Sequence, residues 1–413
     1  MPLDGTPDPH EIEVPFGTRL KLNRTRRGMT REVLGGLVGR SASWVKALEN
    51  GRLGTPKLPI LLRLAEALRI HDLSELTGEQ SVAVELFTGP GHAHLPAVRA
   101  AINAFPMVTS RPAPPIAHLQ ARLSRAWSAR HSAPNHREVL GGLLPGLIED
   151  AQLAVHQADD EPTRRTAQAV LSEVYALAQF FIAYQPAQSL LWRVCERSVV
   201  AAQESGDPHA LGVSAWLMAQ AHRDAGDWDA ADVVTTNTTR QLSGNLADAT
   251  DDVLAIWGAL QFEAGYTAAR RGETGNAWRH WDTAQQVADR LPGSYYHPVT
   301  SFSQAIMGAH AVTVAVELRN GGESVRQAAR TASDVIPSRP RRARHQIERA
   351  RAFHLDAQPG EALRVLAEAH EAAPETIRYN GYARRMILEE LDSRQRERRE
   401  QANTLADKIG ILA

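Results

Sequence analysis

Residues 26–52 read RRGMTREVLGGLVGRSASWVKALENGR, and this stretch decides the fold of the first part of the chain. Two short segments with apolar periodicity lie between glycines, and a hydroxyl residue that favours a helix start precedes each of them. Thr30 is placed to cap the first segment, which ends at Gly39, and Ser41 is placed to cap the second, which ends at Gly51. The stretch therefore predicts two short helices joined by a tight turn.

Further short helices are expected on both sides of this pair. FGTRLKLNRTRRG (16–28) precedes it, and PILLRLAEALRI (59–70) and DLSELTG (72–78) come after it. Helices of this length are marginal in water on their own, so all of them must pack together. We predict a five-helix domain over residues 16–77. A disordered arm over residues 1–15, acidic and rich in proline, is expected to precede it.

The predicted domain is basic although the whole chain is nearly neutral. The chain has 46 lysines and arginines against 47 aspartates and glutamates, which gives a formal charge of −1. Residues 16–71 hold twelve of the basic and three of the acidic residues, a net charge of +9, so the remainder is near −10. A basic module joined to an acidic body indicates a polyanionic partner for the module. Charge alone leaves a merely solvated surface open as the alternative.

Residues 16–77 resemble the helix-turn-helix domain of the xenobiotic-response-element and phage-repressor (Cro/C1-type) family. The similarity is carried by the stretch quoted above, together with LLRLAEALRI at 61–70. It implies a five-helix, lambda-repressor-like fold that binds double-stranded DNA as a homodimer, with residues 41–50 as the recognition helix. Such a helix enters the major groove, and its N-terminal residues meet the edges of the bases.

The resemblance also implies roles for individual residues. Ser43 and Lys46 are expected to reach bases or phosphates, whereas Val45 and Leu48 are expected to point into the core. Trp44 is ambiguous, because it can stack on the DNA backbone or pack under a loop. The candidate DNA-contacting residues are Thr30, Arg31, Arg40, Ser41, Ala42, Ser43, Trp44, Lys46, Ala47 and Arg52.

Five positions of this domain match or depart from the family pattern. Arg24 and Glu49 match positions that form an internal ion pair in the family, so a structural role is expected for them. Arg31 stands where glutamine is common, which should strengthen the attraction for phosphate. Gly35 and Gly36 stand where alanine or long polar residues are usual. Because glycine in a helix costs roughly 1 kcal/mol relative to alanine, we expect a soft domain that depends on docking or dimerisation.

The rest of the chain is predicted to be helical. Residues 78–115 are rich in proline and glycine and are expected to be a linker that partly docks on the helices after it. Residues 116–391 have helical periodicity, with turn signals between long helices at Gly226, Gly272, Gly321 and Gly360. This pattern indicates an α-solenoid of tetratricopeptide-like helix hairpins, with a compact helical domain without repeats as the alternative. Residues 392–413 are expected to form a charged C-terminal helix.

An α-solenoid has a concave face, lined by the first helix of each hairpin, that can accept a peptide or a small molecule. Some relatives implied by the resemblance sense short peptides with such a domain. Aromatic, amide and guanidinium groups on these helices are suited to that task, although packing between helices is the alternative role for each. The candidate ligand-binding residues are Trp216, Gln220, Arg223, Trp257, Gln261 and Tyr266.

Other function classes find little support in the sequence. The string HEAAP at 370–374 has proline in place of the second histidine of a zinc-peptidase motif, and GHAH at 91–94 is only a weak metal signal. No phosphate-binding loop is present, so we expect neither an enzyme, a cofactor nor a metal site. The single cysteine, Cys195, is expected to be buried and fits a reducing cytoplasm. No run of 18 apolar residues occurs, so no membrane span is expected.

Together these observations predict a cytoplasmic, sequence-specific transcriptional regulator that binds DNA as a dimer and senses a ligand or peptide through its helical body. The alternative is a protein-interaction scaffold, or an antitoxin-like partner, in which the first domain binds DNA weakly or not at all.

Overall fold

A computed structural model of the chain contains helices, and no strands, among the residues that it describes, which are 14–68, 70, 73–78, 91–104, 111–244, 246 and 248–411. The all-α class is therefore confirmed. The chain divides into two compact units, residues 1–87 and 88–413, and each is described by itself. The predicted arm, apart from its last two residues, lies outside the described residues, as do residues 79–90 and 105–110 of the predicted linker.

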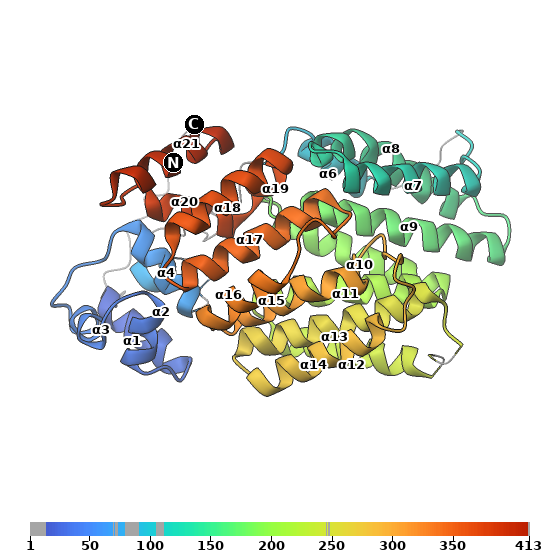
Figure 1. Cartoon of the computed structure of the whole chain (residues 1–413). Coiled ribbons are helices and arrows are strands. Elements are labelled where there is room, and N and C mark those ends of the chain that lie inside the picture. The colour runs from blue at the N-terminus through green and yellow to red at the C-terminus, as the bar shows by residue number, and fades with distance from the viewer. Residues whose placement is uncertain are drawn as a thin grey trace, which may run out of the picture. The chain divides into compact units, whose positions relative to one another are not determined.

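The first unit begins with a series of short helices (Figure 1). The starts of two of them carry the predicted capping residues. The Thr30 hydroxyl accepts the backbone N–H of Val33 at 3.3 Å, and the Ser41 hydroxyl accepts that of Trp44 at 3.2 Å. Gly39 comes after the second helix with a left-handed φ of 65°. The helices are α1 Phe16–Arg26, α2 Arg31–Leu37, α3 Ala42–Glu49, α4 Leu58–Leu68 and α5 Ser74–Thr77.

Apolar side chains from all five of these helices meet in one core. Leu20, Leu34, Leu48, Leu64 and Leu76, one from each helix in turn, are fully buried. Burying a leucine side chain stabilises a fold by about 1.5–3 kcal/mol relative to leaving it exposed. Shared burial of this kind explains how helices too short to persist alone are held together.

The second unit consists of longer helices that pack in sequence. In most cases each helix contacts the next one, and α7, α9, α11, α13, α15 and α17 also contact one another in series. This pattern is typical of helix-hairpin arrays. The helices are α6 Leu95–Asn103, α7 Ile116–Ser132, α8 His136–His156, α9 Glu161–Ile182, α10 Gln188–Ser205, α11 Pro208–Ala225, α12 Trp228–Ser243, α13 Asp251–Arg271, α14 Thr274–Ala288, the 3₁₀ turn η2 Gln304–Ile306, α15 Met307–Glu317, α16 Gly321–Arg330, α17 Arg339–Leu355, α18 Pro359–Ala372, α19 Pro374–Tyr379, α20 Gly381–Glu390 and α21 Arg396–Ile409.

The turns between paired helices match the predicted glycine signals only in part. Gly226 and Gly272 end α11 and α13 with left-handed φ values of 81° and 83°. At the two later turns the left-handed residues are Arg319 and Ala357, with φ values of 59° and 58°. The predicted turn glycine Gly321 instead opens α16. Two of the turns therefore hold a left-handed conformation without the residue that adopts it most easily.

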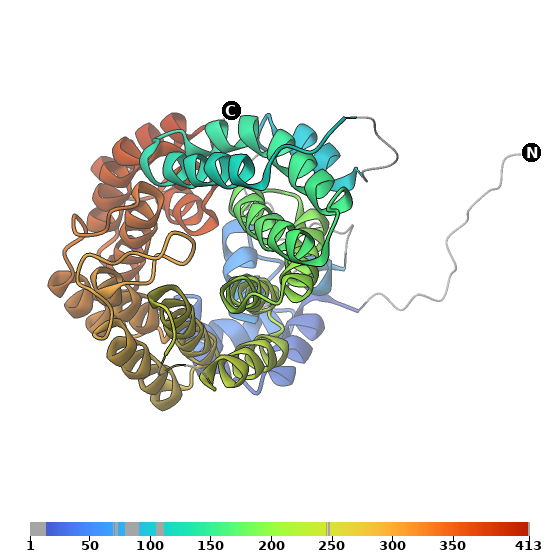
Figure 2. The ribbon, with the colours of Figure 1, turned by 90° about the vertical axis from the view of Figure 1, so that its right-hand side faces the viewer.

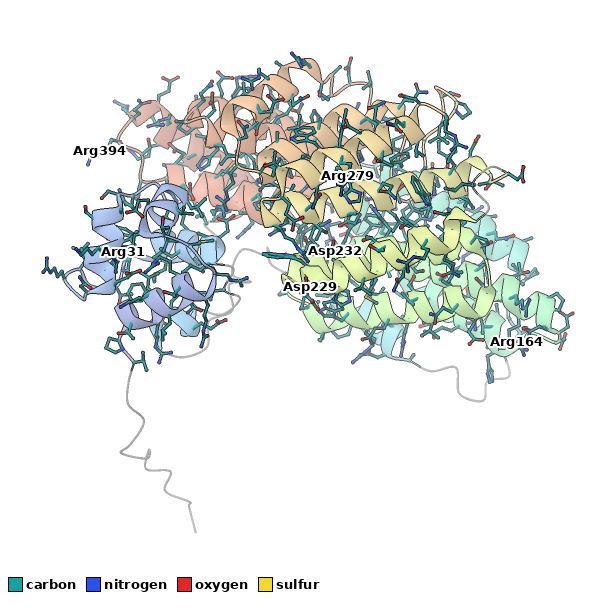
Figure 3. The ribbon with its side chains drawn as sticks, turned by 90° about the horizontal axis from the view of Figure 1, so that it is seen from below. Arg31, Arg164, Asp229, Asp232, Arg279 and Arg394 are labelled. Carbon is teal, nitrogen blue, oxygen red and sulfur yellow. The ribbon has the colours of Figure 1, made fainter. Side chains whose placement is uncertain are left out.

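Ion pairs reinforce the packing between neighbouring helices. Arg271, the last residue of α13, lies 2.7 Å from Asp229 and 3.1 Å from Asp232, both on α12. Figure 3 labels the two aspartates, which lie close together on one helix.

The two ends of the second unit meet, so that its helices wind into a ring with α7 and α8 beside the C-terminal helices (Figure 2). His131, near the end of α7, joins the ends through both ring nitrogens. Its Nε2 donates to the carbonyl of Pro298 at 2.8 Å, and its Nδ1 accepts from the Ser338 hydroxyl at 2.9 Å. Burial lowers the pKa of His131 to about 4, so the ring is neutral at physiological pH.

A carboxylate at the other end of the sequence caps α8. Glu375 of α19 accepts the backbone N–H groups of Arg137 and Glu138, at 2.6 and 3.2 Å. These N–H groups belong to the first turn of α8, where no partner within the helix exists for them. The N–H groups at the start of α8 are thus accepted by a residue more than 200 positions away. This contact joins the two ends of the ring, and the region where α7 and α8 meet α17 and α19 is called the seam below.

The predicted linker and charged tail both contribute to the second unit. Within the predicted linker, α6 packs on α8 and buries Val98 and Ile102 in the unit's largest core cluster. At the other end, α21 packs on α18 and α20 and buries Ala402 and Leu405 in the last cluster. Residues 95–103 of the predicted linker and 396–409 of the predicted tail are therefore part of the second unit. None of the described helices combines the length and apolar character that a membrane crossing requires.

Candidate functional site

The outward face of α3 carries small polar and basic side chains. Ser43 and Lys46 are exposed, as is the capping residue Ser41. Val45 and Leu48 are buried on the opposite face, at 0% and 1% exposure. Ala42 and Ala47 are half-buried and lie between the two faces. An eight-residue helix of this kind presents little bulk outward, which allows a close approach to a partner surface.

Trp44 packs against the core of the first unit and does not project into solvent. Its indole is half-buried and lies against the core of the first unit. The Arg40 guanidinium lies 5.8 Å from the centroid of the indole ring, within range of a cation–π contact. Trp44 therefore holds Arg40 close to the start of α3.

Glu49 is the buried anion of the first unit and serves two arginines at once. Its side chain is fully buried, and its Oε1 lies 2.5 Å from Arg24 Nε, while its Oε2 lies 2.7 Å from Arg31 Nε. Burial opposes ionisation, but the hydrogen bonds from the two arginines outweigh it and hold the pKa of Glu49 below its ordinary value. Arg24 also donates to the carbonyl of Met29 at 2.6 Å. The pair joins α1 to α3, and Arg31 adds α2.

The ion pair with Glu49 gives Arg31 a structural contact that the sequence did not predict. The sequence favours a phosphate-contacting role for it, yet its Nε is engaged by Glu49 and its side chain is about one-third exposed. Figure 3 labels Arg31 among the side chains of the first unit. Thr30 likewise uses its hydroxyl to cap α2. The neighbouring candidates Arg40, Lys46 and Arg52 are exposed and form no ion pair within the described part of the chain.

Two glycines allow the helices of this unit to approach one another. A Cβ on Gly35 would lie 2.6 Å from the carbonyl oxygen of Arg40, so only glycine fits where α2 meets the turn before α3. A Cβ on Gly17 would run into the carbonyl oxygens of Leu48 and Glu49 at the end of α3. Gly36 has open space around it. From the sequence, Gly35 was expected only to lower the stability of its helix, and no role was predicted for Gly17.

Four of the six predicted ligand-binding residues lie together in the second unit. Trp216, Gln220 and Arg223 of α11 and Tyr266 of α13 line one cavity with a volume of about 150 Å³. Because they come from the first helices of successive pairs, the cavity lies on the inner side of the ring. Its lining also includes residues that the sequence did not single out as ligand contacts, among them Arg130, Arg137, Phe180, Phe262, Arg341 and Arg344.

The other two predicted ligand-binding residues do not line this cavity. Trp257 donates its indole N–H to the Thr239 carbonyl, at 3.2 Å, and lies 3.1 Å from the Ser243 hydroxyl on α12. Gln261 pairs with His280 of α14 at 2.9 Å. Trp257 thus joins α13 to the second helix of the preceding pair, and Gln261 joins α13 to the second helix of its own pair. For both side chains packing replaces the expected ligand contact.

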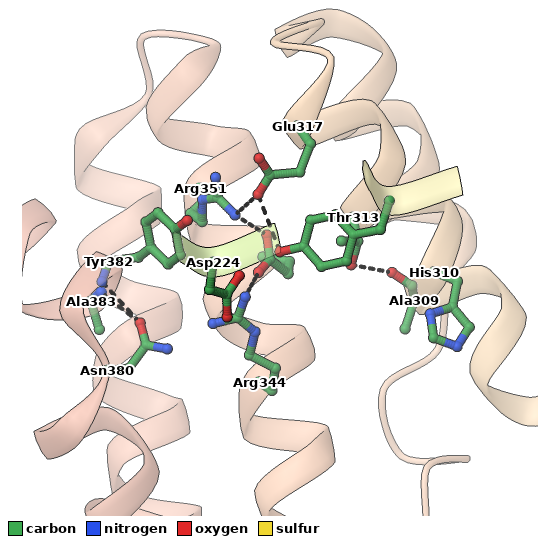
Figure 4. A network of polar contacts seen from close by, with 12 residues as sticks. Asp224, Ala309, His310, Thr313, Glu317, Arg344, Arg351, Asn380, Tyr382 and Ala383 are labelled. Carbon is green, nitrogen blue, oxygen red and sulfur yellow. Dashed lines mark hydrogen bonds and ion pairs between the residues drawn. The ribbon is translucent and has the colours of Figure 1, made fainter. Parts of the chain in front are cut away.

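A polar network borders the cavity and fixes some of its walls (Figure 4). Glu317 of α15 accepts from Tyr266 at 3.3 Å and from Arg351 of α17 at 2.8 Å. Although burial opposes ionisation, Arg351 and Arg270 hold the pKa of Glu317 well below its ordinary range. Asn380 accepts the first N–H groups of α20. The network thus links three helices of the ring and leaves Tyr266 firmly placed.

Metal-binding and thiol chemistry find no support in the described residues. These contain no group of three or more histidine, cysteine, aspartate or glutamate side chains with the geometry to hold a metal ion. His92 and His94 instead contact Glu138. Cys195 is buried, donates to Gln179, and has a pKa raised by burial to about 12, which keeps it in the unreactive thiol form.

Comparison with known proteins agrees with the geometry of the first unit. Residues 15–76 match the family described as a helix-turn-helix domain. Neither a curated protein nor a solved structure matches the chain significantly. The chain carries a helix-turn-helix DNA-binding domain at its N-terminal end.

Proposed function

We propose that the chain is a sequence-specific transcriptional regulator that places α3 in the major groove of its operator. The observation that carries the proposal is the outward face of α3, where Ser43 and Lys46 are exposed and Lys46 has no ion-pair partner among the described residues. The surrounding residues 16–71 have a net charge of +9. The xenobiotic-response-element and Cro type of the domain is part of this proposal.

The exposed side chains suit the chemistry of base edges and phosphates. Lys46 can donate to guanine O6 and N7, and the Ser43 hydroxyl can donate or accept. The methyl groups of Ala42 and Ala47 suit contact with thymine. Arg40 and Arg52 can neutralise phosphates beside the groove, which positions the helix without reading sequence.

We further propose that the protein acts as a homodimer and that the second unit, an array of tetratricopeptide-like hairpins, senses a ligand. Two copies of α3 would then read half-sites about 34 Å apart, or a multiple of this spacing. A ligand regulates such a protein only by binding one conformation better than another. No enzymatic step belongs to the proposal.

Selection of bound duplexes from a random DNA library, with subsequent affinity measurements between 50 and 200 mM salt, tests the proposal. A regulator using six to ten phosphate contacts loses about 10³- to 10⁵-fold in affinity over this range. The double variant Ser43→Ala, Lys46→Ala should reduce discrimination between the selected and random duplexes by about tenfold or more. The control Lys21→Ala removes an exposed charge on α1 and should leave discrimination unchanged.

Two outcomes would contradict the proposal. Unchanged discrimination in the double variant would remove Ser43 and Lys46 as base-reading residues. Failure of the full chain to retain any duplex, even at 50 mM salt, would favour the interaction scaffold instead.

A further inference from the structure

The cavity inside the ring is built from both ends of the second unit. Arg130 of α7 and Arg137 of α8 reach it from one side of the seam, and Arg341 of α17 reaches it from the other. Its volume of about 150 Å³ is close to that of a cavity that accommodates one benzene-sized ring. A space of this volume therefore suits a small molecule and not an extended peptide.

Positive charge in this cavity is not balanced by the protein. Two of its arginines are paired, because Arg223 contacts Glu263 and Arg344 lies 2.7 Å from Glu348. Three others, Arg130, Arg137 and Arg341, have no carboxylate within ion-pair distance anywhere in the described residues. Glu263 is the one acidic side chain among the lining residues, and Arg223 already neutralises it.

The three guanidinium groups that have no carboxylate partner contact neutral groups instead. Arg137 donates to the backbone carbonyls of Phe181 and Ala183. The Arg130 guanidinium lies 4.0 Å from the centroid of the Phe180 ring. Arg341 has one long contact, 3.4 Å, to His310 Nδ1, and its Nε has no hydrogen-bond partner among the described residues. Donors therefore remain available where the charge is unpaired.

Burial of these three arginines is electrostatically unfavourable for the protein on its own. Burial lowers the pKa of Arg130 to about 10, and the nearby Arg137 and Arg341 act in the same direction. Burial also lowers the pKa values of Arg137 and Arg341. Histidine adds no charge here, because burial keeps the pKa of His310 well below its ordinary value. Glu375 and Glu348 offset this cost only in part, for Arg137 and Arg341 respectively, so an anion placed among the arginines would lower it further.

Part of the cavity wall is aromatic. Phe180, Trp216, Phe262 and Tyr266 come from three successive helices of the inner face. Tyr266 and Phe262 are buried, and the cation–π contact of Arg223, 3.9 Å from the Tyr266 ring centroid, holds the tyrosine in place. A flat apolar group fits against this wall while an acidic group faces the arginines.

We propose that this cavity binds a small organic anion, with a carboxylate or phosphate group held by Arg130, Arg137 and Arg341 and a planar apolar part against Phe180, Trp216 and Phe262. The anion joins the two ends of the ring, because its ligating arginines belong to α7, α8 and α17. Binding therefore favours the closed ring over any state in which the seam opens. This inference deepens the proposed sensing role and rests on it for its regulatory consequence alone.

Calorimetric titration of the full chain at 150 mM salt tests the binding itself, without DNA. The probes are phenyl phosphate and benzoate, with benzamide as the neutral analogue of benzoate. We expect the anions to bind at least about tenfold more tightly than benzamide, as charge-assisted hydrogen bonds are stronger than neutral ones. Equal binding of benzamide, or no binding of either anion, would overturn the proposal.

Three variants locate the site. Arg341→Gln and Arg130→Gln each remove one unpaired charge and should weaken phenyl phosphate binding about tenfold or more. Removing such a charge should not lower the thermal stability of the unliganded chain, so both variants should fold. The matched control is Arg342→Gln, one position further along α17 and outside the cavity lining, which should bind as the parent does. Unchanged affinity in both cavity variants, or an equal loss in the control, would contradict the assignment.

A final arm separates this inference from the proposed regulatory function. The affinity of the full chain for its selected duplex is measured with and without saturating phenyl phosphate. Anion binding that leaves duplex affinity unchanged upholds the cavity and contradicts the sensing role. Anion binding by a chain that retains no duplex also upholds the cavity and contradicts the DNA-binding function.

Discussion

Arg31 Nε lies 2.7 Å from Glu49 Oε2, and the same carboxylate lies 2.5 Å from Arg24 through its other oxygen. One buried carboxylate therefore joins α1, α2 and α3 of the first unit and fixes the position of α3. The two arginines differ in burial, since the side chain of Arg24 is 11% exposed and that of Arg31 is 34% exposed. Their contributions to stability must differ in the same sense.

Arg24→Ala should destabilise the first unit much more than Arg31→Ala. Removing Arg24 leaves Glu49 with its more exposed partner and also removes the bond to Met29, so a loss of about 3 kcal/mol is expected. Removing Arg31 leaves the buried pair intact and should cost about 1 kcal/mol or less. Hydrogen exchange of peptides covering residues 16–68, read by mass spectrometry, measures both. Equal losses would mean that the two ion pairs are equivalent.

The stability of the first unit should fall in acid because of Glu49. Its pKa in the folded chain is lowered, so its contribution is fully present above its unfolded pKa, about 4.3, and is lost as the pH falls through the folded value. The variant Glu49→Gln should be less stable at neutral pH and should show a shallower decline below pH 4. Hydrogen exchange at several pH values, corrected for intrinsic rates, measures this decline. A variant with the full acid decline would assign it to other carboxylates.

Arg31 should contribute less to DNA binding than its sequence position indicates. Arg40→Ala removes an exposed charge with no ion-pair partner among the described residues, so the dependence of log affinity on log salt should become shallower by about one. Arg31→Ala should change this slope by clearly less, because Glu49 already compensates its charge. Fluorescence anisotropy with the selected duplex gives both slopes. A full unit of change for Arg31 would show that it leaves Glu49 to reach a phosphate in the complex.

Local rules made the helices of the first unit predictable. Thr30 and Ser41 cap helices, and Gly39 and Gly51 lie just beyond helix ends in a left-handed conformation. Such roles depend on only a few neighbouring residues, so the sequence alone indicates them. The pairing of Arg31 with Glu49 was not predictable in this way. It depends on how two helices cross, and the sequence pattern does not contain that angle.

Features that depend on closure of the ring could not be predicted from the sequence either. Arg130 and Arg137 are separated from Arg341 by more than 200 positions in sequence, and the three share a cavity only because α7 and α8 lie beside α17. A signal existed in retrospect, since arginines recur among the apolar residues of RPRRARHQIERARAF at 339–353 and a helix so rich in charge can be buried only against partners. Helix pairing predicts the inner side for Trp216, Gln220, Arg223 and Tyr266, which line the cavity, and equally for Trp257 and Gln261, which do not.

The two glycines of α2 should respond oppositely to alanine. Gly35→Ala places a Cβ 2.6 Å from the Arg40 carbonyl, and because that atom belongs to the backbone, a loss of about 1–3 kcal/mol is expected. Gly36→Ala meets open space and should stabilise the unit by about 0.4–1 kcal/mol through the unfolded chain. Hydrogen exchange over residues 31–49 compares them. Stabilisation by both would mean that the helices can move apart without cost.

Glu375 should hold the seam of the ring through the start of α8. Glu375→Ala leaves the N–H groups of Arg137 and Glu138 without their acceptor, and the loss of such a cap costs about 1–2 kcal/mol. Glu375→Gln keeps one acceptor oxygen and should fall between the parent and the alanine variant. The control Glu371→Ala removes a carboxylate that is 69% exposed and pairs with Lys408 at the surface, so it should leave the melting temperature unchanged. If hydrogen exchange in residues 136–150 is as slow in Glu375→Ala as in the parent, the seam is held by other contacts, such as the His131 bonds to Pro298 and Ser338.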